Sequence, residues 1–185
     1  MEDLSLHILD IVENSITAGA RNMLIIIRED SKEDLLNLEI KDDGKGMDEE
    51  FVTKVMDPFV TTKEKEKKVG LGIALLNEAA KAAHGSMTVE SRKGVGTIVR
   101  ASFQLSHVDR KPLGNMKETL LCLLATYRGV DFTYEHQKGE RHCRLNSGEL
   151  REKAGEAALS LPEWIRFLKE QIKGEFEKLL MNASQ

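Results

Sequence analysis

The hydrophobic and polar positions along this chain change their period several times, and each change marks a predicted element. Over residues 4–16 the apolar positions recur at helical spacing, which predicts an amphipathic helix that ends at Gly19. Residues 22–28 are almost all apolar and rich in β-branched side chains, as in a buried strand. Residues 35–41 alternate between apolar and polar, which predicts the hairpin partner of that strand.

The pattern continues in the same manner after this first hairpin. Residues 48–56 predict a short helix, and residues 72–83 predict a longer one. Two strands follow over residues 86–91 and 97–103, joined by a glycine-containing turn. A helix, two strands, a loop, a helix and two strands predict a mixed sheet with helices on one face. The fold class that we expect is therefore α+β, a two-layer α/β sandwich.

A domain boundary is predicted within residues 105–115, where Pro112 and Gly114 separate two periodic segments. We expect a first domain over residues 1–106 and a small C-terminal α+β extension over residues 113–185. The elements predicted for the second part are helices over 116–126, 147–155 and 161–181 and strands over 130–136 and 141–146.

The last predicted helix carries an apolar stripe at helical spacing. Its members are Trp164, Ile165, Phe167, Leu168, Ile172 and Phe176. Such a stripe usually forms part of a core or the seam of a homodimer, and docking of a partner protein is the alternative.

The composition restricts the classes of function. The chain has 185 residues, 31% of them charged, and a net charge of −4. This acidic balance argues against nucleic acid as the main partner, because binding phosphates needs a basic face. No apolar run approaches the ~18 residues that a membrane helix requires, and the start at Met1 is followed by acidic residues. We therefore expect a cytoplasmic protein with no membrane partner.

The first candidate site consists of Asp10 and Asn14, which are four positions apart and share one helix face. The neutral oxygen of an asparagine suits Mg²⁺ that is bound to phosphates. A carboxylate one turn earlier can orient or deprotonate a water molecule. The alternative is an exposed helix face with ordinary polar residues.

The second candidate is Asp42, followed by Gly44, Gly46 and Met47 at the end of a predicted strand. A carboxylate fixed there can accept a hydrogen bond from an exocyclic amine. The glycines allow the backbone to approach a planar ligand closely. A simple turn rich in aspartate and glycine is the alternative.

Two further glycine motifs follow. Gly70, Leu71 and Gly72 precede or open the second long helix, where backbone N–H groups can bind phosphate. No Walker lysine follows them, and the GxGxxG pattern of dinucleotide-binding folds is incomplete. The segment 94–97 places Gly96 and Thr97 between the last two strands, where a tight hairpin needs glycine in any case.

The order of these four motifs over residues 4–104 resembles the GHKL superfamily of ATPases. Histidine kinases, gyrase-type ATPases and MutL-type ATPases share its nucleotide-binding fold, called the Bergerat fold. Two segments, 12–20 and 42–46, look like the start of a MutL-type domain. The segments that look like a histidine-kinase catalytic domain are 57–63, 70–73, 84–86 and 94–97. The second set is longer and favours the kinase-like branch.

The resemblance implies ATP and Mg²⁺ as ligands. It assigns the metal to Asn14, the adenine amino group to Asp42, and a position near the adenine to Thr97. Lys63 falls in a lid over residues 57–69, where it could reach the terminal phosphates. The full set of implied binding residues is Asn14, Asp42, Gly44, Gly46, Met47, Lys63, Gly70, Leu71, Gly72 and Thr97.

Asp10 stands where the hydrolytic members of the superfamily carry a glutamate as general base. Its side chain is one methylene shorter, so we expect slow hydrolysis. Only three residues precede the first helix, and His7 is expected to pack in it rather than accept phosphate. The resemblance thus implies a stand-alone ATP-binding regulatory protein that phosphorylates or controls a partner protein. The alternatives are a nucleotide-switched binding module without kinase activity and a MutL-like ATPase.

Overall fold

The computed structural model describes residues 2–55, 71–155 and 160–180, and it contains one sheet of six strands. The order across the sheet is β3-β4-β2-β1-β5-β6. β1 and β5 run parallel, and the other neighbouring strands are antiparallel. The bounds are β1 Asn22–Asp30, β2 Leu35–Asp42, β3 Ser86–Arg92, β4 Gly96–Gln104, β5 Asp131–Lys138 and β6 Arg141–Asn146. The expected α+β class with a mixed sheet is confirmed.

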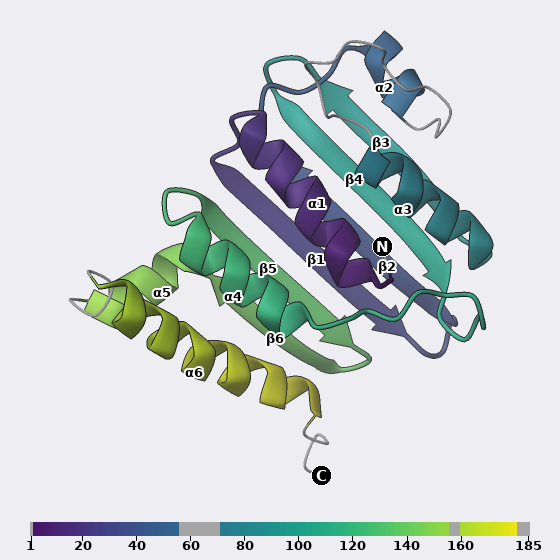
Figure 1. Cartoon of the computed structure of the whole chain (residues 1–185). Helices are drawn as coiled ribbons and strands as arrows, with labels where there is room; N and C mark the ends of the chain where they lie inside the picture. The colour runs from purple at the N-terminus through teal and green to yellow at the C-terminus, as the bar shows by residue number, and fades with distance from the viewer. Residues whose placement is uncertain (1, 56–70, 156–159, 181–185) are drawn as a thin grey trace.

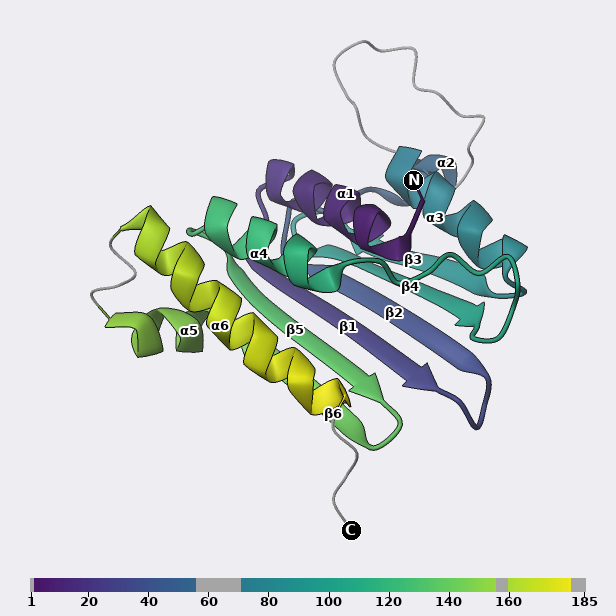
Figure 2. The same cartoon turned by 60° about the horizontal axis from the view of Figure 1, so that its bottom comes forward.

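The helices α1, α3, α4 and α6 cover one face of this sheet (Figures 1 and 2). The bounds are α1 Leu4–Thr17, α2 Glu49–Val55, α3 Leu71–Ala82, α4 Met116–Thr126, α5 Ser147–Ala154 and α6 Leu161–Leu180. Burial alternates along β1, where Met23, Ile25 and Ile27 are buried and Arg28 is exposed. The strand therefore turns these three buried side chains toward the helices, which confirms the two-layer arrangement.

The ends of the helices follow local capping chemistry. The side chain of Asp3 caps α1 by accepting from the backbone N–H of Leu6 at 3.1 Å. Gly19, with φ +89°, follows the end of α1, as the sequence predicts. At the end of α3, His84 adopts the left-handed conformation, with φ +54°. Gly85 is needed there for another reason, because a Cβ at this position would lie 1.7 Å from the carbonyl oxygen of Ser102.

The C-terminal part joins the same sheet as the N-terminal part. β5 pairs in parallel with β1, and one hydrophobic core includes side chains from both parts. The connecting segment lies against the start of α1, where the Leu4 N–H donates to the Pro112 carbonyl at 2.9 Å. The division of the chain into two domains stays a prediction, while both parts contribute strands to one sheet.

The apolar stripe of α6 packs into the core, the more usual of its expected uses. Trp164 and Leu168 are fully buried, and the indole N–H of Trp164 donates to the Leu124 carbonyl at 3.2 Å. The ring of Phe176 stacks on Tyr134 with 5.8 Å between the ring centroids. These contacts attach α6 to α4 and β5.

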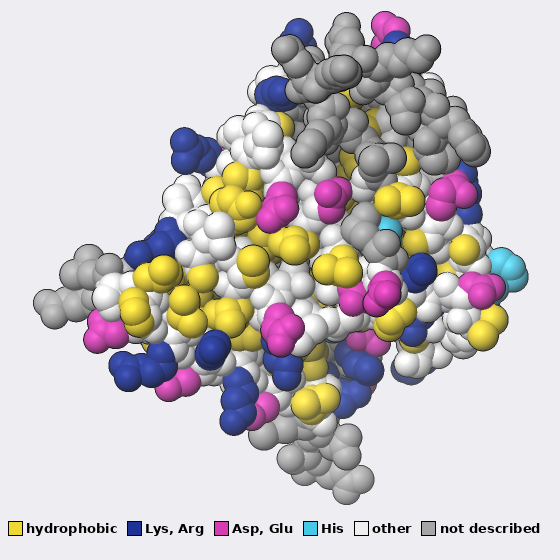
Figure 3. Space-filling view, viewed as in Figure 1, with side chains coloured by type: hydrophobic (Ala, Val, Ile, Leu, Met, Phe, Trp, Pro, Cys, Tyr) yellow, Lys and Arg dark blue, Asp and Glu magenta, His cyan; other side chains and the backbone are white. Residues whose placement is uncertain are grey.

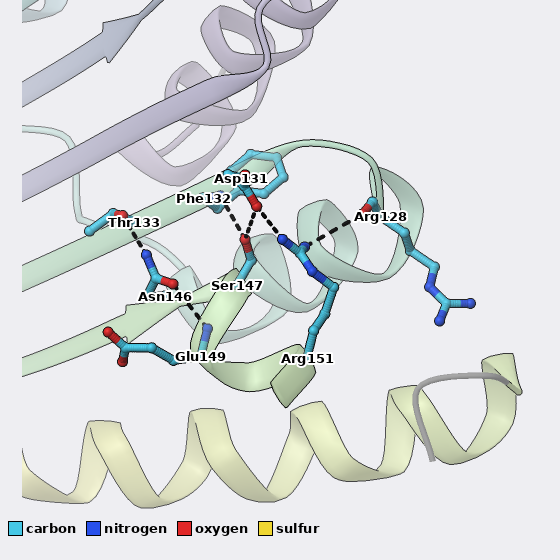
Figure 4. A network of polar contacts seen from close by, with 8 residues as sticks. All are labelled: Arg128, Asp131, Phe132, Thr133, Asn146, Ser147, Glu149 and Arg151. Carbon is cyan, nitrogen blue, oxygen red and sulfur yellow. Dashed lines mark hydrogen bonds and ion pairs between the residues drawn. The ribbon is translucent and has the colours of Figure 1, made fainter. Parts of the chain in front are cut away.

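A polar network fixes α5 to the start of β5 (Figure 4). Asn146 is the N-cap of α5. The hydroxyl of Ser147 accepts from the Phe132 N–H at 2.9 Å, and Arg151 reaches back from α5 to form an ion pair with Asp131. The short helix is therefore held by its capping residues and one ion pair, since it has few apolar residues of its own.

Candidate nucleotide site

Asp10 and Asn14 meet the beginning of α3. The side-chain amide of Asn14 donates to Asp10 Oδ2 at 3.1 Å. Gly72, in the first turn of α3, lies so close that a Cβ there would be 1.7 Å from the same Asp10 oxygen. The structure thus brings Gly72 against Asp10 and Asn14, which lie about sixty positions earlier in the sequence. Asn14 uses its amide nitrogen in this contact, so its side-chain oxygen is the end that can meet a cation.

Asp42 ends β2 with its carboxylate buried; the residue is 8% exposed. Ser15 donates its hydroxyl to Asp42 Oδ2 at 2.7 Å, and the Gly44 N–H donates to Asp42 Oδ1 at 2.8 Å. Each carboxylate oxygen therefore has one donor and keeps further acceptor capacity. Since Ser15 follows Asn14 on α1, one helix serves both groups of site residues.

Ser15 is a further site residue, and none of the four sequence motifs indicated it. Its signal was a hydroxyl at a core-facing position of α1, in the same stripe as Ile8, Ile11 and Val12. A buried hydroxyl needs a partner, and its partner here is the Asp42 carboxylate.

The glycines of the Asp42 loop and of the β3–β4 turn allow two backbones to touch. Gly46 has φ +63°, and a Cβ there would lie 2.1 Å from the Arg92 carbonyl oxygen. Gly96 has φ +128°, and its Cβ would lie 2.0 Å from the Asp42 carbonyl oxygen. The Gly94 N–H donates to the Lys45 carbonyl at 2.7 Å. The turn is thus a hairpin, as one interpretation of the sequence held, and it also supports the Asp42 loop.

Thr97 lies beside Asp42 in the sheet, and its hydroxyl contacts Ser91, a residue that none of the sequence motifs indicated. Asp42 of β2, Thr97 of β4 and Ser91 of β3 form one cross-strand row. The Ser91 and Thr97 hydroxyl oxygens are 2.9 Å apart, and the Met47 N–H donates to Ser91 Oγ at 2.8 Å. The only sequence signal for Ser91 was its alternation with Met87 along β3, which puts it on the helix-facing side.

Asp43 has a structural part in this loop. Its carboxylate accepts from the backbone N–H groups of Arg21 at 2.7 Å and of Asn22 at 2.8 Å, and from the Asn22 side chain at 2.6 Å. Partial burial acts to raise the pKa of Asp43, but these hydrogen bonds outweigh it and hold the pKa below its ordinary value. Asp43 thereby anchors the loop to the start of β1, next to Asp42.

The predicted lid over 57–69, including Lys63, and the residue Gly70 lie outside the described residues, and Leu71 is the first residue of α3. His7 is 2% exposed, as expected for a packed helix histidine. Burial lowers its pKa. Within residues 2–55, 71–155 and 160–180, no group of three or more His, Cys, Asp or Glu side chains could hold a metal ion. None of the described helices is both long and apolar enough to cross a membrane.

A helix with Asp10 and Asn14 lies over a mixed sheet, beside a buried aspartate at the end of a strand and its companion glycines. This is the arrangement of the Bergerat fold of the GHKL ATPases. Residues 2–107 match the family described as "Histidine kinase-, DNA gyrase B-, and HSP90-like ATPase". The chain belongs to this family.

Relatives with known names match about half of this chain. Sensor histidine kinase YvrG of Bacillus subtilis is 28% identical over 98 residues, which cover 51% of this chain and 17% of the relative. Sporulation kinase C of the same organism is 28% identical over 97 residues, or 52% of this chain and 22% of the relative. The chain therefore spans less than a quarter of the length of these curated relatives.

A solved structure extends the likeness of the fold to the C-terminal part. The Aquifex aeolicus MutL ATPase domain complexed with ADP aligns with a TM-score of 0.50 and 18% sequence identity. The alignment covers 92% of this chain and 70% of the MutL domain. At this identity the likeness concerns the fold alone.

Proposed function

We propose that this chain binds ATP with Mg²⁺ between α1, the first turn of α3, the end of β2 and the start of β4. The observation that carries the proposal is the buried carboxylate of Asp42, held by Ser15 and Gly44 with acceptor capacity left on both oxygens. An ionised carboxylate only accepts hydrogen bonds, which suits the amino group of adenine. Guanine carries a carbonyl oxygen at that position. Membership of an ATPase family and the ADP in the MutL domain support an adenine nucleotide.

The residues around Asn14 fit a magnesium ion that is bound to the phosphates. Mg²⁺ prefers oxygen ligands and keeps several waters and phosphate oxygens, so one protein oxygen can suffice. The side-chain oxygen of Asn14 supplies it, and Asp10 orients the Asn14 amide through the 3.1 Å hydrogen bond. When bound, the ion would neutralise charge on the phosphates. The N-terminus of α3, which begins beside Asp10, favours the same negative charge.

With ATP bound, the chain acts as a regulatory protein that phosphorylates or controls a partner protein. The kinase names of the sequence relatives and the kinase-like motifs support this proposal. The likeness to the MutL domain covers more of the chain, so a MutL-like ATPase is the second candidate. A binding module that is switched by nucleotide without phosphoryl transfer is the third.

Transfer of label from γ-labelled ATP separates these candidates. We expect label to appear on a protein that co-purifies with the chain, and the pure chain to release phosphate well below the ~10 s⁻¹ median of enzymes. The slow hydrolysis follows from the short Asp10 side chain, because a misplacement of ~1 Å can cost ~100-fold in rate. Asp10→Asn should remove whatever phosphate release or transfer the parent shows.

The matched control is Glu13→Gln on the same helix. The carboxylate of Glu13 accepts a hydrogen bond from the Tyr127 hydroxyl at 3.3 Å. That variant should hydrolyse and transfer as the parent does. Rapid hydrolysis by the pure parent, lost in the Asp10 variant, would instead support the hydrolytic branch. Binding of ATP with neither transfer nor hydrolysis would support the switch module.

A further inference from the structure

The hydroxyl of Ser91 lies among three polar atoms. The Met47 N–H is 2.8 Å from Ser91 Oγ, the Gly96 carbonyl oxygen is at 3.0 Å, and the Thr97 hydroxyl oxygen is at 2.9 Å. A serine hydroxyl has one proton to donate and two lone pairs to accept with. Three neighbours therefore use its whole capacity.

The chemistry of the neighbours fixes the direction of each hydrogen bond. A backbone N–H only donates, so Met47 occupies one lone pair of Ser91. A carbonyl only accepts, so the Ser91 proton goes to Gly96. The one position left on Ser91 is a lone pair, and Thr97 can fill it only by donating its own proton. The Thr97 hydroxyl then has only its lone pairs left, so it can accept a hydrogen bond from a ligand but cannot donate one.

On the side of Thr97 opposite Ser91 lies Asp42, whose carboxylate is also an acceptor. Asp42, Thr97 and Ser91 stand in one row across β2, β4 and β3, and residues paired in this way point to the same face of a sheet. That face is the one covered by the helices, since Ile40 and Val99 of the adjacent row are buried. Ionised Asp42 accepts only, so Asp42 and Thr97 together present two acceptors at the sheet end.

We propose that Ser91 is a positioning residue that sets the nucleobase selectivity of the site by fixing the direction of the Thr97 hydroxyl proton. The inference rests on the proposed binding of ATP. Two acceptors match an exocyclic amine, which has two hydrogens to donate, whether directly or through a water. They reject a carbonyl oxygen at the same position, because two acceptors cannot hydrogen-bond each other. Ser91 therefore acts through Thr97 and does not touch the base.

Ser91→Ala tests the proposal through the ratio of affinities for ITP and ATP with Mg²⁺, measured by calorimetry. ITP carries an oxo group where ATP carries the amino group, and a hydrogen on N1 where ATP has none, so the effect of Ser91 is the change in this ratio between the variant and the parent. Without Ser91, the Thr97 hydroxyl can rotate and donate to the oxo group. The preference for ATP should fall about fivefold, as expected for one hydrogen bond between neutral groups. Ser91→Thr keeps the hydroxyl and should keep the preference.

The matched control is Ser102→Ala, which removes a hydroxyl from the same pair of strands at the opposite end. Ser102 Oγ lies 3.1 Å from Ser86 Oγ, and its loss should leave the ratio unchanged. If the alanine variant of Ser91 fails to fold, the near-isosteric Ser91→Cys, with its weak S–H donor, should lower the preference for ATP in the same way.

An unchanged ratio in Ser91→Ala overturns the inference, whether both affinities stay at the parent's values or fall by the same factor. An equal fall is what a purely structural role of Ser91 gives. This result differs from the failure of the proposed function itself, which would appear as a parent protein that binds neither nucleotide.

Discussion

Two serine hydroxyls, Ser15 and Ser91, contact the side chains that we propose for binding adenine. Ser15 holds the Asp42 carboxylate at 2.7 Å, and Ser91 lies 2.9 Å from the Thr97 hydroxyl. Inside a protein such hydrogen bonds are stronger than in water, and an unpaired partner is costly. The direction of each side chain is therefore set before any ligand arrives, which lowers the cost of binding.

Asn14 is the residue on which the metal dependence of binding should rest. Asn14→Ala removes the side-chain oxygen proposed for Mg²⁺ and the hydrogen bond to Asp10. We expect the variant to fold and to bind ATP equally with and without Mg²⁺, whereas the parent should bind more tightly with the ion. Titrations with ATP in Mg²⁺ and in EDTA give this comparison. A variant that retains the parent's response to Mg²⁺ would contradict the assignment.

The sequence predicted the residues that carry recognisable motifs, and it missed those that support them. Asp42 and Asn14 stand in ordered motifs, and the structure brings each close to other predicted residues. Ser15 joins Asp42 across 27 positions, from a helix to a strand, and no local pattern records such a contact. Ser91 has its role because β3 pairs with β4 in one register, which is a property of the sheet.

At the scale of elements, a polar network joins β1 and β5 beneath α6. His136 Nε2 lies 2.8 Å from a carboxylate oxygen of Glu29, and His136 Nδ1 lies 3.0 Å from the Tyr134 hydroxyl. Tyr134 stacks on Phe176 of α6, and Lys138 forms an ion pair with Glu29 at 3.4 Å. This network connects the only parallel strand pair of the described sheet to the helix that covers it.

Stability should fall in acid partly because of Glu29. The hydrogen bond from His136 lowers the pKa of Glu29, and burial opposes it. Because the pKa of Glu29 is lower in the folded protein than in the unfolded chain, its ionised carboxylate stabilises the fold. This contribution is fully present above the ordinary pKa of 4.5 and is lost as the pH falls below it. Glu29→Gln should therefore cost about 1–2 kcal/mol at pH 7 and should reduce the loss of stability between pH 6 and pH 3. Urea unfolding across this range measures both effects.

Glu135→Gln is the control for that experiment. Glu135 lies on β5, one of the two strands that the network joins, but its contact with Arg144 of β6 is exposed and 3.8 Å long. Exposed ion pairs contribute little, so this variant should follow the parent at every pH. Identical pH profiles for Glu29→Gln and the parent would refute the role given to the network.

The periods of the sequence predicted the elements well, and the differences lie at their ends. The strand predicted over 130–136 runs over Asp131–Lys138, because Gln137 and Lys138 continue to pair with Arg28 and Glu29 of β1. Backbone pairing does not require apolar side chains, so a strand can extend beyond its hydrophobic pattern.

At the scale of the whole molecule, the main feature that the sequence did not predict is that the C-terminal strands complete the N-terminal sheet. β5 lies beside β1 although the two are about a hundred residues apart. Parallel pairing at such a separation leaves no local signal, because it depends on the crossover between the strands.

The space-filling view in Figure 3 shows hydrophobic side chains on the outer face of the helix layer, with Lys and Arg toward the side of α6.

We expect the buried Asp42 carboxylate to select an adenine nucleotide, and calorimetric titration of the parent, Asp42→Asn and Asp109→Asn tests this most directly. Asp109 is an exposed carboxylate in the β4–α4 connection, with a side chain that is 70% exposed, and serves as the control. We expect the parent and the Asp109 variant to bind ATP·Mg²⁺ equally and to bind GTP poorly. Asp42→Asn should bind ATP ~10-fold more weakly or worse, because a hydrogen bond to a charged group contributes ~1.5–3 kcal/mol. Equal affinities of the parent for ATP and GTP, or a folded Asp42 variant that binds ATP as the parent does, would contradict the account.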